Sequence, residues 1–100
     1  MSAYVIFNYK ILDRNRIDEL SKISKDSDNK SKYESKVVVA SSVNCVEGIT
    51  LPNIVIYEFE DLETAKNWYY KGNESEVTKL RKEITEGWVT IVPGYVQSTT

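Results

Sequence analysis

Three side chains of this sequence have types that bind or protonate small molecules: Glu58, Trp68 and Arg81. A carboxyl group in an apolar strand takes a raised pKa and can act as a general acid or base. A guanidinium holds a carboxylate through paired hydrogen bonds, and an indole offers a large apolar surface for stacking. The sequence contains no histidine, so Glu58 is the candidate proton acceptor.

Each of these residues also has a purely structural interpretation. Trp68 stands at helical spacing behind smaller apolar residues, so core packing is the alternative to ligand stacking. Glu58 and Arg81 could instead form an ion pair that closes the cavity. Tyr57 and Asn8 are the candidates for its wall, although a solvent-exposed sheet rim is the default position for Asn8.

Residue periodicity indicates the elements that must position these side chains. β-branched and aromatic runs predict strands, and apolar stripes behind acidic caps predict helices. The resulting order is β-α-β-β-α-β, a ferredoxin-like α+β fold with a four-stranded antiparallel sheet and the helices on one face. The expected strands are 4–11, 36–43, 54–59 and 88–92, and the expected helices follow Asp13, run from Asp61 to about Lys71, and contain Val77, Leu80 and Ile84.

The second face of this sheet also needs a cover. Residues 37–40 and 54–57 are apolar on both faces of their strands, which predicts that both strands are buried. A chain of 100 residues has no further element to supply the cover, so we expect a homodimer whose two sheets face each other as a barrel.

Composition excludes several function classes. An apolar fraction of 41% supports one folded domain, expected over residues 1–96 with a loose tail at 97–100. The formal charge of −2 with scattered cations predicts no nucleic-acid binding, and no apolar run approaches the roughly 18 residues of a membrane span. A single cysteine, no histidine and no evident leader lead us to expect a cytoplasmic protein without a metal site or other cofactor.

The second half of the chain resembles the DUF1330 family, a domain of unknown function within the dimeric α/β-barrel group. That family has a Val-Val-Ile-Glu-Phe strand, a capped helix ending Ala-x-x-Trp-Tyr, a Leu-Arg pair, and a Gly before a Val-x-Val-x-Gly strand. The order and spacing agree from about residue 54 to 95. The matching positions are Val55-Ile56-Tyr57-Glu58-Phe59, Ala65-Lys66-Asn67-Trp68-Tyr69, Leu80-Arg81, Gly87 and Val89-Thr90-Ile91-Val92-Pro93-Gly94.

The resemblance implies a dimeric fold and leaves two functions open. One is binding of a small aromatic or carboxylated molecule in a sheet–helix cavity, with cofactor-free chemistry as in enzymes of the wider superfamily. The other is a non-catalytic structural or interaction dimer with a filled cavity. The family's Gly-Gly and Arg-Gly-Gly are replaced here by Glu34-Ser35 and about Ala40-Ser41-Ser42, which favours the second function. A cavity above about 300 Å³ with convergent polar atoms would favour the first.

Overall fold

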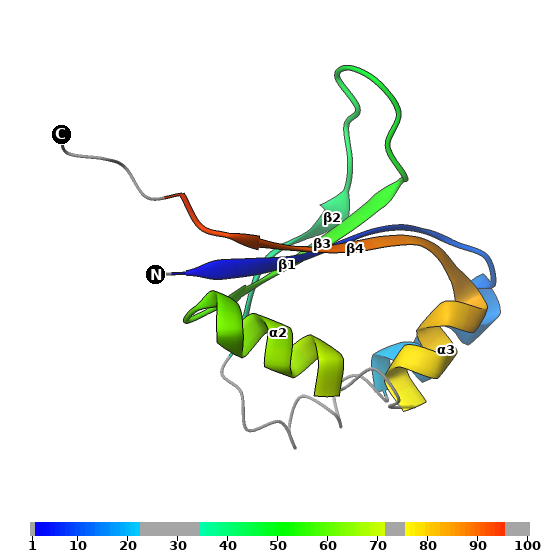
Figure 1. Cartoon of the computed structure of the whole chain (residues 1–100). Coiled ribbons are helices and arrows are strands. Elements are labelled where there is room, and N and C mark those ends of the chain that lie inside the picture. The colour runs from blue at the N-terminus through cyan, green and yellow to red at the C-terminus, as the bar shows by residue number, and fades with distance from the viewer. Residues whose placement is uncertain (1, 23–34, 72–75, 96–100) are drawn as a thin grey trace, which may run out of the picture.

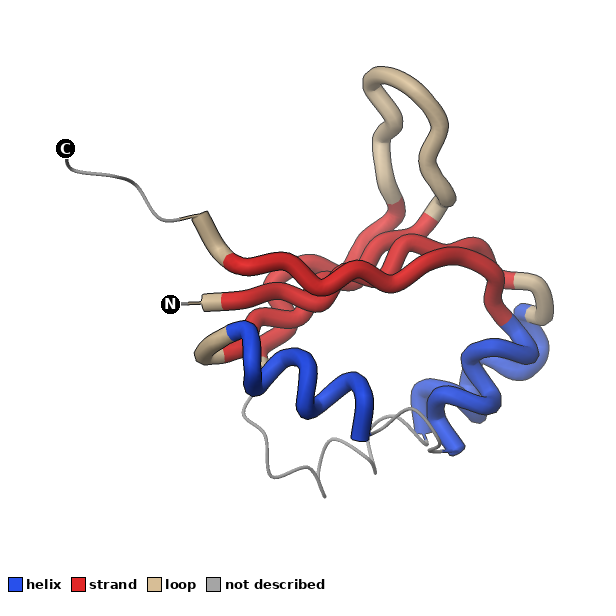
Figure 2. Tube along the Cα trace, viewed as in Figure 1, coloured by secondary structure: helices blue, strands red, loops and turns tan. Residues whose placement is uncertain are grey.

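The computed structural model describes residues 2–22, 35–71 and 76–95. These residues form one sheet with helices on one of its faces (Figure 1, Figure 2). The predicted tail at 97–100 lies outside the described residues. The elements are β1 (Ala3–Ile11), the 3-10 turn η1 (Arg14–Arg16) leading into helical residues 17–22, β2 (Lys36–Ser42), β3 (Asn53–Phe59), α2 (Leu62–Lys71), α3 (Glu76–Ile84) and β4 (Thr85–Pro93).

The sheet has the strand order β2-β3-β1-β4, and every neighbouring pair is antiparallel. The register sets Val5 opposite Tyr57 and Ile91, and Tyr4 opposite Glu58 and Val92. Because side chains alternate between the faces of a strand, odd-numbered residues of β1 lie on the face covered by the helices, and even-numbered ones lie on the other. We call these the helix face and the open face. An α+β fold with an antiparallel four-stranded sheet is therefore confirmed.

The core lies between the helix face and α2. Its fully buried apolar side chains are Ala3, Val5, Phe59 and Ala65. The helix starts at this point because Asp61 caps it: a carboxylate oxygen of Asp61 accepts a hydrogen bond from the Thr64 backbone N–H at 2.7 Å. By fixing the first turn of α2, the cap sets which side of the helix faces the sheet. The later side chains of α2 take their directions from that.

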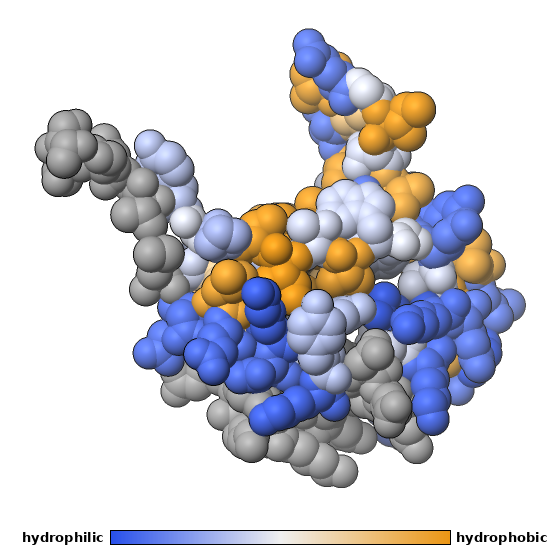
Figure 3. Space-filling view, in the orientation of Figure 1, coloured by the Kyte–Doolittle hydropathy of each residue, from blue (hydrophilic) through white to orange (hydrophobic). Residues whose placement is uncertain are grey.

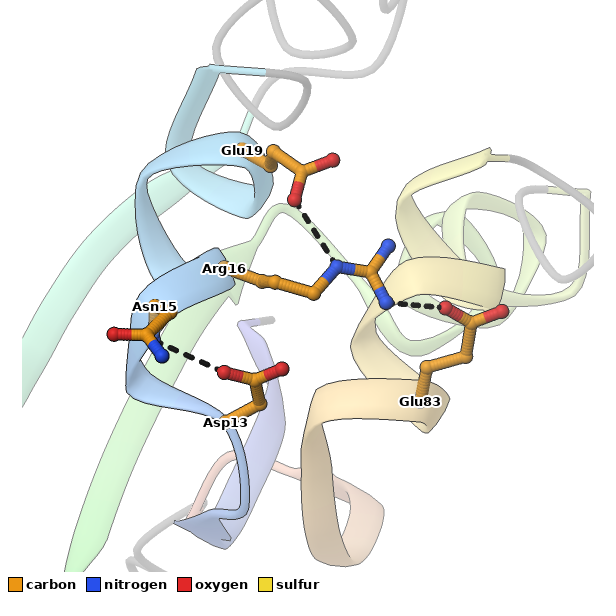
Figure 4. Close-up of polar contacts among 5 residues, drawn as sticks. All are labelled: Asp13, Asn15, Arg16, Glu19 and Glu83. Atoms are coloured by element: carbon orange, nitrogen blue, oxygen red, sulfur yellow. Dashed lines mark hydrogen bonds and ion pairs between the residues drawn. The ribbon is translucent and has the colours of Figure 1, made fainter.

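α3 is held against the first helical segment by a charged contact (Figure 4). The Arg16 guanidinium donates to Glu19 at 3.0 Å and to Glu83 of α3 at 2.9 Å. These hydrogen bonds, first the one to Glu19 and then the one to Glu83, raise the pKa of Arg16. Because all three side chains reach solvent, the contact sets the position of α3 more than it adds stability.

β2 is not buried in the single chain, so its burial by a second subunit stays a prediction. It is the edge strand of the sheet, and each of its residues is exposed in the single chain. A bulge at Val38 shifts its register against β3. Residues 37–40 are apolar on both faces of this strand, as the sequence indicated. A local sequence pattern, however, specifies neither the position of a strand at the edge of a sheet nor the element that covers it. β4 begins at Thr85, three residues before the predicted Trp88, because it follows α3 without a linker.

A long connection between β2 and β3, residues 43–52, projects from the sheet, and we call it the arm. Figure 1 shows it on the side of the sheet away from α2 and α3. Its base is closed by a hydrogen bond from the Val43 N–H to the Pro52 carbonyl at 2.9 Å. Near its tip Gly48 takes a φ of +78°, a conformation that favours glycine. None of the helices in the described ranges is long and apolar enough to span a membrane.

Candidate functional site

A cavity of about 540 Å³ lies between the helix face and the helices. Strand residues form its floor, and residues of α2, α3 and the first helical segment form its sides. Both apolar and polar side chains line it. They are Phe7, Tyr9, Leu20, Val55, Tyr57, Trp68, Tyr69, Val77, Thr78, Arg81, Lys82, Thr85, Glu86, Gly87, Trp88 and Val89.

Aromatic rings form one wall of this cavity. Phe7 meets Tyr57 edge to face, with ring centroids 5.8 Å apart, and meets Trp68 in the same way at 6.3 Å. The rings of Tyr57 and Trp68 are 5.2 Å apart and tilted. Trp68 also contacts the buried ring of Phe59 at 5.0 Å. Such contacts fix the ring orientations, so the wall is rigid and presents apolar surface to a ligand.

Arg81 brings a positive charge to this aromatic wall. Its guanidinium carbon lies 5.3 Å from the centroid of the Phe7 ring, a cation–π contact. The side chain is partly buried, and no carboxylate within the described ranges forms an ion pair with it. The Thr85 hydroxyl donates to the Arg81 backbone carbonyl at 2.5 Å, which ties the end of α3 to β4. The cation–π contact keeps the guanidinium at the wall, and no carboxylate of the described residues competes with an anion for its hydrogen-bond donors.

Glu58 lies on the open face, away from this cavity. Its carboxylate accepts a hydrogen bond from the Tyr4 hydroxyl at 3.1 Å, and the two residues are direct partners in the sheet. The hydrogen bond to Glu58, followed by its negative charge, raises the pKa of the Tyr4 phenol. A Glu58–Arg81 ion pair is excluded because the sheet separates the two side chains.

Asn8 also lies on the open face, where it supports the arm. It is 1% exposed, and both ends of its amide are fully used. The amide nitrogen donates to the carbonyls of Leu51 and Asn53, at 3.1 and 2.9 Å. The amide oxygen accepts from the Leu51 N–H and the Thr50 hydroxyl, both at 3.1 Å. Asn8 thus has no hydrogen-bonding capacity left for a ligand.

The structure divides the predicted site residues into two groups. Tyr57, Trp68 and Arg81 meet in the cavity as expected, and their role in binding stays a prediction. The expectation that Glu58 and Asn8 share that cavity is corrected, because both project from the opposite face. Glu58 lies on the face opposite Tyr57 because side chains alternate along β3. The register of β1 against β3, which no local pattern specifies, puts Asn8 on the same face as Glu58.

The cavity residues that the sequence reasoning missed include two on β1. Phe7 and Tyr9 stand on the helix face of β1, next to Val5. A usable signal was present, since strict alternation separates Phe7 from the even-numbered Asn8. In the described ranges, no group of carboxylate and cysteine side chains is arranged to hold a metal ion.

The fold and cavity define a class: a small α+β protein with one antiparallel sheet and an aromatic cavity under its helices. The chain belongs to a family described as Domain of unknown function (DUF1330), whose model matches residues 2–95. The resemblance seen in the second half is thus confirmed over nearly the whole chain.

One solved structure supports the fold. A de novo designed protein, Foldit4, is similar with a TM-score of 0.60 and 16% identity, over 95% of this chain and 100% of that one. A structural genomics protein, YJCS, has a TM-score of 0.47 and 17% identity, over 97% of this chain and 100% of that one. No curated protein sequence matches this chain. The similarity to Foldit4 concerns the fold alone, so function has to be argued from the cavity.

Proposed function

We propose that this protein binds a small planar molecule that carries an anionic group, such as an aromatic carboxylate. One observation carries the proposal: a cavity of about 540 Å³ combines an aromatic wall with an arginine that has no carboxylate partner among the described residues. The volume lies within the range of about 300–1,000 Å³ typical of small-molecule sites. It also exceeds the volume of about 300 Å³ above which we expected ligand binding rather than a cavity filled by side chains.

The two halves of the cavity supply different parts of the recognition. Phe7, Tyr57 and Trp68 offer rigid apolar surface for a flat ring, and burial of that ring drives binding. Arg81 offers paired donors in a fixed plane, which suits a carboxylate better than a neutral group. Lys82 lies at the same cavity and adds to its positive charge.

The proposal is one of binding, with no proton transfer assigned. Glu58, the predicted proton acceptor, is across the sheet from this ligand position. Among the described lining residues the one carboxylate is that of Glu86, which is paired with Lys10 at 3.0 Å. The absence of a cofactor and a cytoplasmic location stay predictions.

A thermal-shift screen tests the proposal, with benzoate and naphthoate compared against their amides. A ligand at 100 times its dissociation constant should stabilise the fold by about 2.7 kcal/mol. Arg81→Met should remove the preference for the acid over the amide, and Arg81→Lys should retain part of it. Lys79→Met, an exposed change on the same helix, is the matched control. Equal binding of acid and amide by the wild type would refute the role of Arg81.

We also propose that the chain forms a ferredoxin-like homodimer in which two open faces pack together as an α/β barrel. The strand order β2-β3-β1-β4 supports this arrangement, as do the apolar open-face residues Ile6, Ile54 and Ile56. Val39, next to Ile56, is 37% exposed in the single chain. In a monomer this apolar face would lack a cover.

Sedimentation at micromolar concentration should therefore give twice the monomer mass. Val39→Asp should produce monomers, because the dimer would bury an unpaired carboxylate at a cost of several kcal/mol. Val37→Asp is the matched control, since Val37 is on the same strand but on the helix face and half exposed. Wild-type protein that sediments as a monomer would rule out the barrel and leave the cavity proposal intact.

A further inference from the structure

The tip of the arm exposes apolar side chains that nothing in the described chain covers. Val46 is 86% exposed and Ile49 is fully exposed, at 101% of its reference area. Figure 3 shows apolar residues on the arm, standing clear of the body of the molecule. Exposure of two β-branched residues together on one projection is unfavourable in water and marks a contact surface.

The arm is braced at its base. The amide of Asn8 makes four hydrogen bonds at this point, with Thr50, Leu51 and Asn53. Asn8 belongs to the central strand β1, so the arm is fixed to the middle of the sheet and not only to its edge. A buried amide with every donor and acceptor paired is a strong constraint on backbone direction. The arm is therefore positioned to present its tip.

The direction of the arm indicates what it contacts. It rises on the open-face side of the sheet, opposite α2 and α3 (Figure 1). If the sheet of a second copy of this chain packed on the open face, that copy would lie next to the arm. The arm also contains no lysine or arginine, and its one charged residue is Glu47. That composition disfavours an anionic membrane surface or nucleic acid as its partner, because both attract cations.

We propose that the arm of each subunit packs its tip, Val46 and Ile49, against a second copy of this chain. The inference rests on the proposed dimer and adds a second contact area to it. In a two-fold dimer both arms make the same contact, so four apolar side chains become buried at once. Each arm then lies against the partner subunit. Asn8 supports the dimer because its hydrogen bonds hold the arm in position.

The first test is the stability of the dimer. Val46→Ser combined with Ile49→Ser should raise the dimer dissociation constant about a hundredfold, which corresponds to about 2.7 kcal/mol. Because both side chains are exposed in the single chain, the circular dichroism of the variant should match the wild type. Leu12→Ser combined with Tyr70→Ser is the matched control, since these apolar residues are exposed outside the arm.

The second test uses the single cysteine of the chain, Cys45, which lies exposed in the arm. A benzophenone maleimide on Cys45 should cross-link to a second copy, as shown by mixing isotopically labelled and unlabelled protein. Peptide mapping should place the cross-link on the strands of the partner.

Cross-links found only within one chain would overturn the proposal. A dimer that keeps its affinity in the serine variant would overturn the arm contact but leave the barrel. A wild-type monomer would overturn both. None of these outcomes bears on ligand binding by the cavity, which the Arg81 variants test separately.

Discussion

Replacement of Asn8 is the sharpest probe of how this fold is held together. Asn8→Ala removes four hydrogen bonds from a side chain that is almost fully buried. A hydrogen bond contributes about 0.5–1.5 kcal/mol net, so the four together suggest about 2–6 kcal/mol. The lower half of that range is expected. The Thr50 hydroxyl can still donate to the Leu51 carbonyl, at 3.4 Å, and water can reach the base of the arm.

We therefore expect Asn8→Ala to lower the free energy of unfolding by about 2–4 kcal/mol, a large share of a total near 5–15 kcal/mol. The assay is urea unfolding followed by far-ultraviolet circular dichroism, at one protein concentration for all variants. Asn44→Ala is the matched control, because Asn44 is an exposed residue of the same arm. Its effect should stay within about 0.5 kcal/mol.

Asn8→Asp sharpens the same test. It keeps the shape and the accepting oxygen but turns the donating nitrogen into an oxygen that faces two carbonyls, those of Leu51 and Asn53. This variant should be less stable than Asn8→Ala at neutral pH. Burial against two carbonyls raises the pKa of its folded-state carboxyl above the ordinary value of about 4, so the variant should regain stability as the pH falls through the raised pKa, and the gain should be complete near pH 4. An Asn8→Ala variant within about 0.5 kcal/mol of wild type would refute the reasoning, because water would then replace the amide without loss.

Three further changes test other parts of the fold. Trp68→Ala should cost about 3 kcal/mol in urea unfolding, since the ring packs against three aromatic neighbours, whereas exposed Tyr70→Ala should cost under about 1 kcal/mol; equal losses would contradict the packing. Gly87→Ala should cost about 2 kcal/mol or more, because a Cβ there would overlap the backbone of β1; an unchanged midpoint would refute that close approach. The Thr64 N–H lowers the pKa of Asp61, so this cap adds stability above the ordinary pKa of the carboxyl and loses it as the pH falls through the lowered one. Asp61→Asn should keep a cap and show a smaller drop in Tm between pH 7 and pH 3, and a drop equal to that of the wild type would argue against the cap.

The elements that could be predicted are those whose signal is local. The switch from the strand at Ile54 to the capped helix at Asp61 was predicted from an apolar run, a change to helical spacing and one cap residue, and the structure has β3 at Asn53–Phe59 and α2 at Leu62–Lys71. These signals act within a few residues, so tertiary context does not alter them. β4 was placed too late, because the signal for its start was hidden by the end of α3.

What could not be predicted depends on contacts between distant segments. Alternation correctly set Glu58 apart from Tyr57 within β3, but nothing in the sequence states which face of β3 meets the helices. The edge position of β2 and the burial of Asn8 beneath the arm have the same cause. In each case the sequence shows the chemical type of the residue. Strand order and register decide which face of the sheet it occupies and which residues surround it.

The register of β1 also separates the two proposals physically. Its odd-numbered residues, such as Val5 and Phe7, face the core and the cavity, and its even-numbered residues, such as Ile6 and Asn8, face the proposed partner and the arm. Substitutions of alternate residues on one strand should therefore divide into those that change ligand binding and those that change assembly. Because neighbouring side chains on a strand lie on opposite faces, this separation follows from backbone geometry. An experiment can therefore refute ligand binding by the cavity without affecting the proposed dimer, and the reverse also holds.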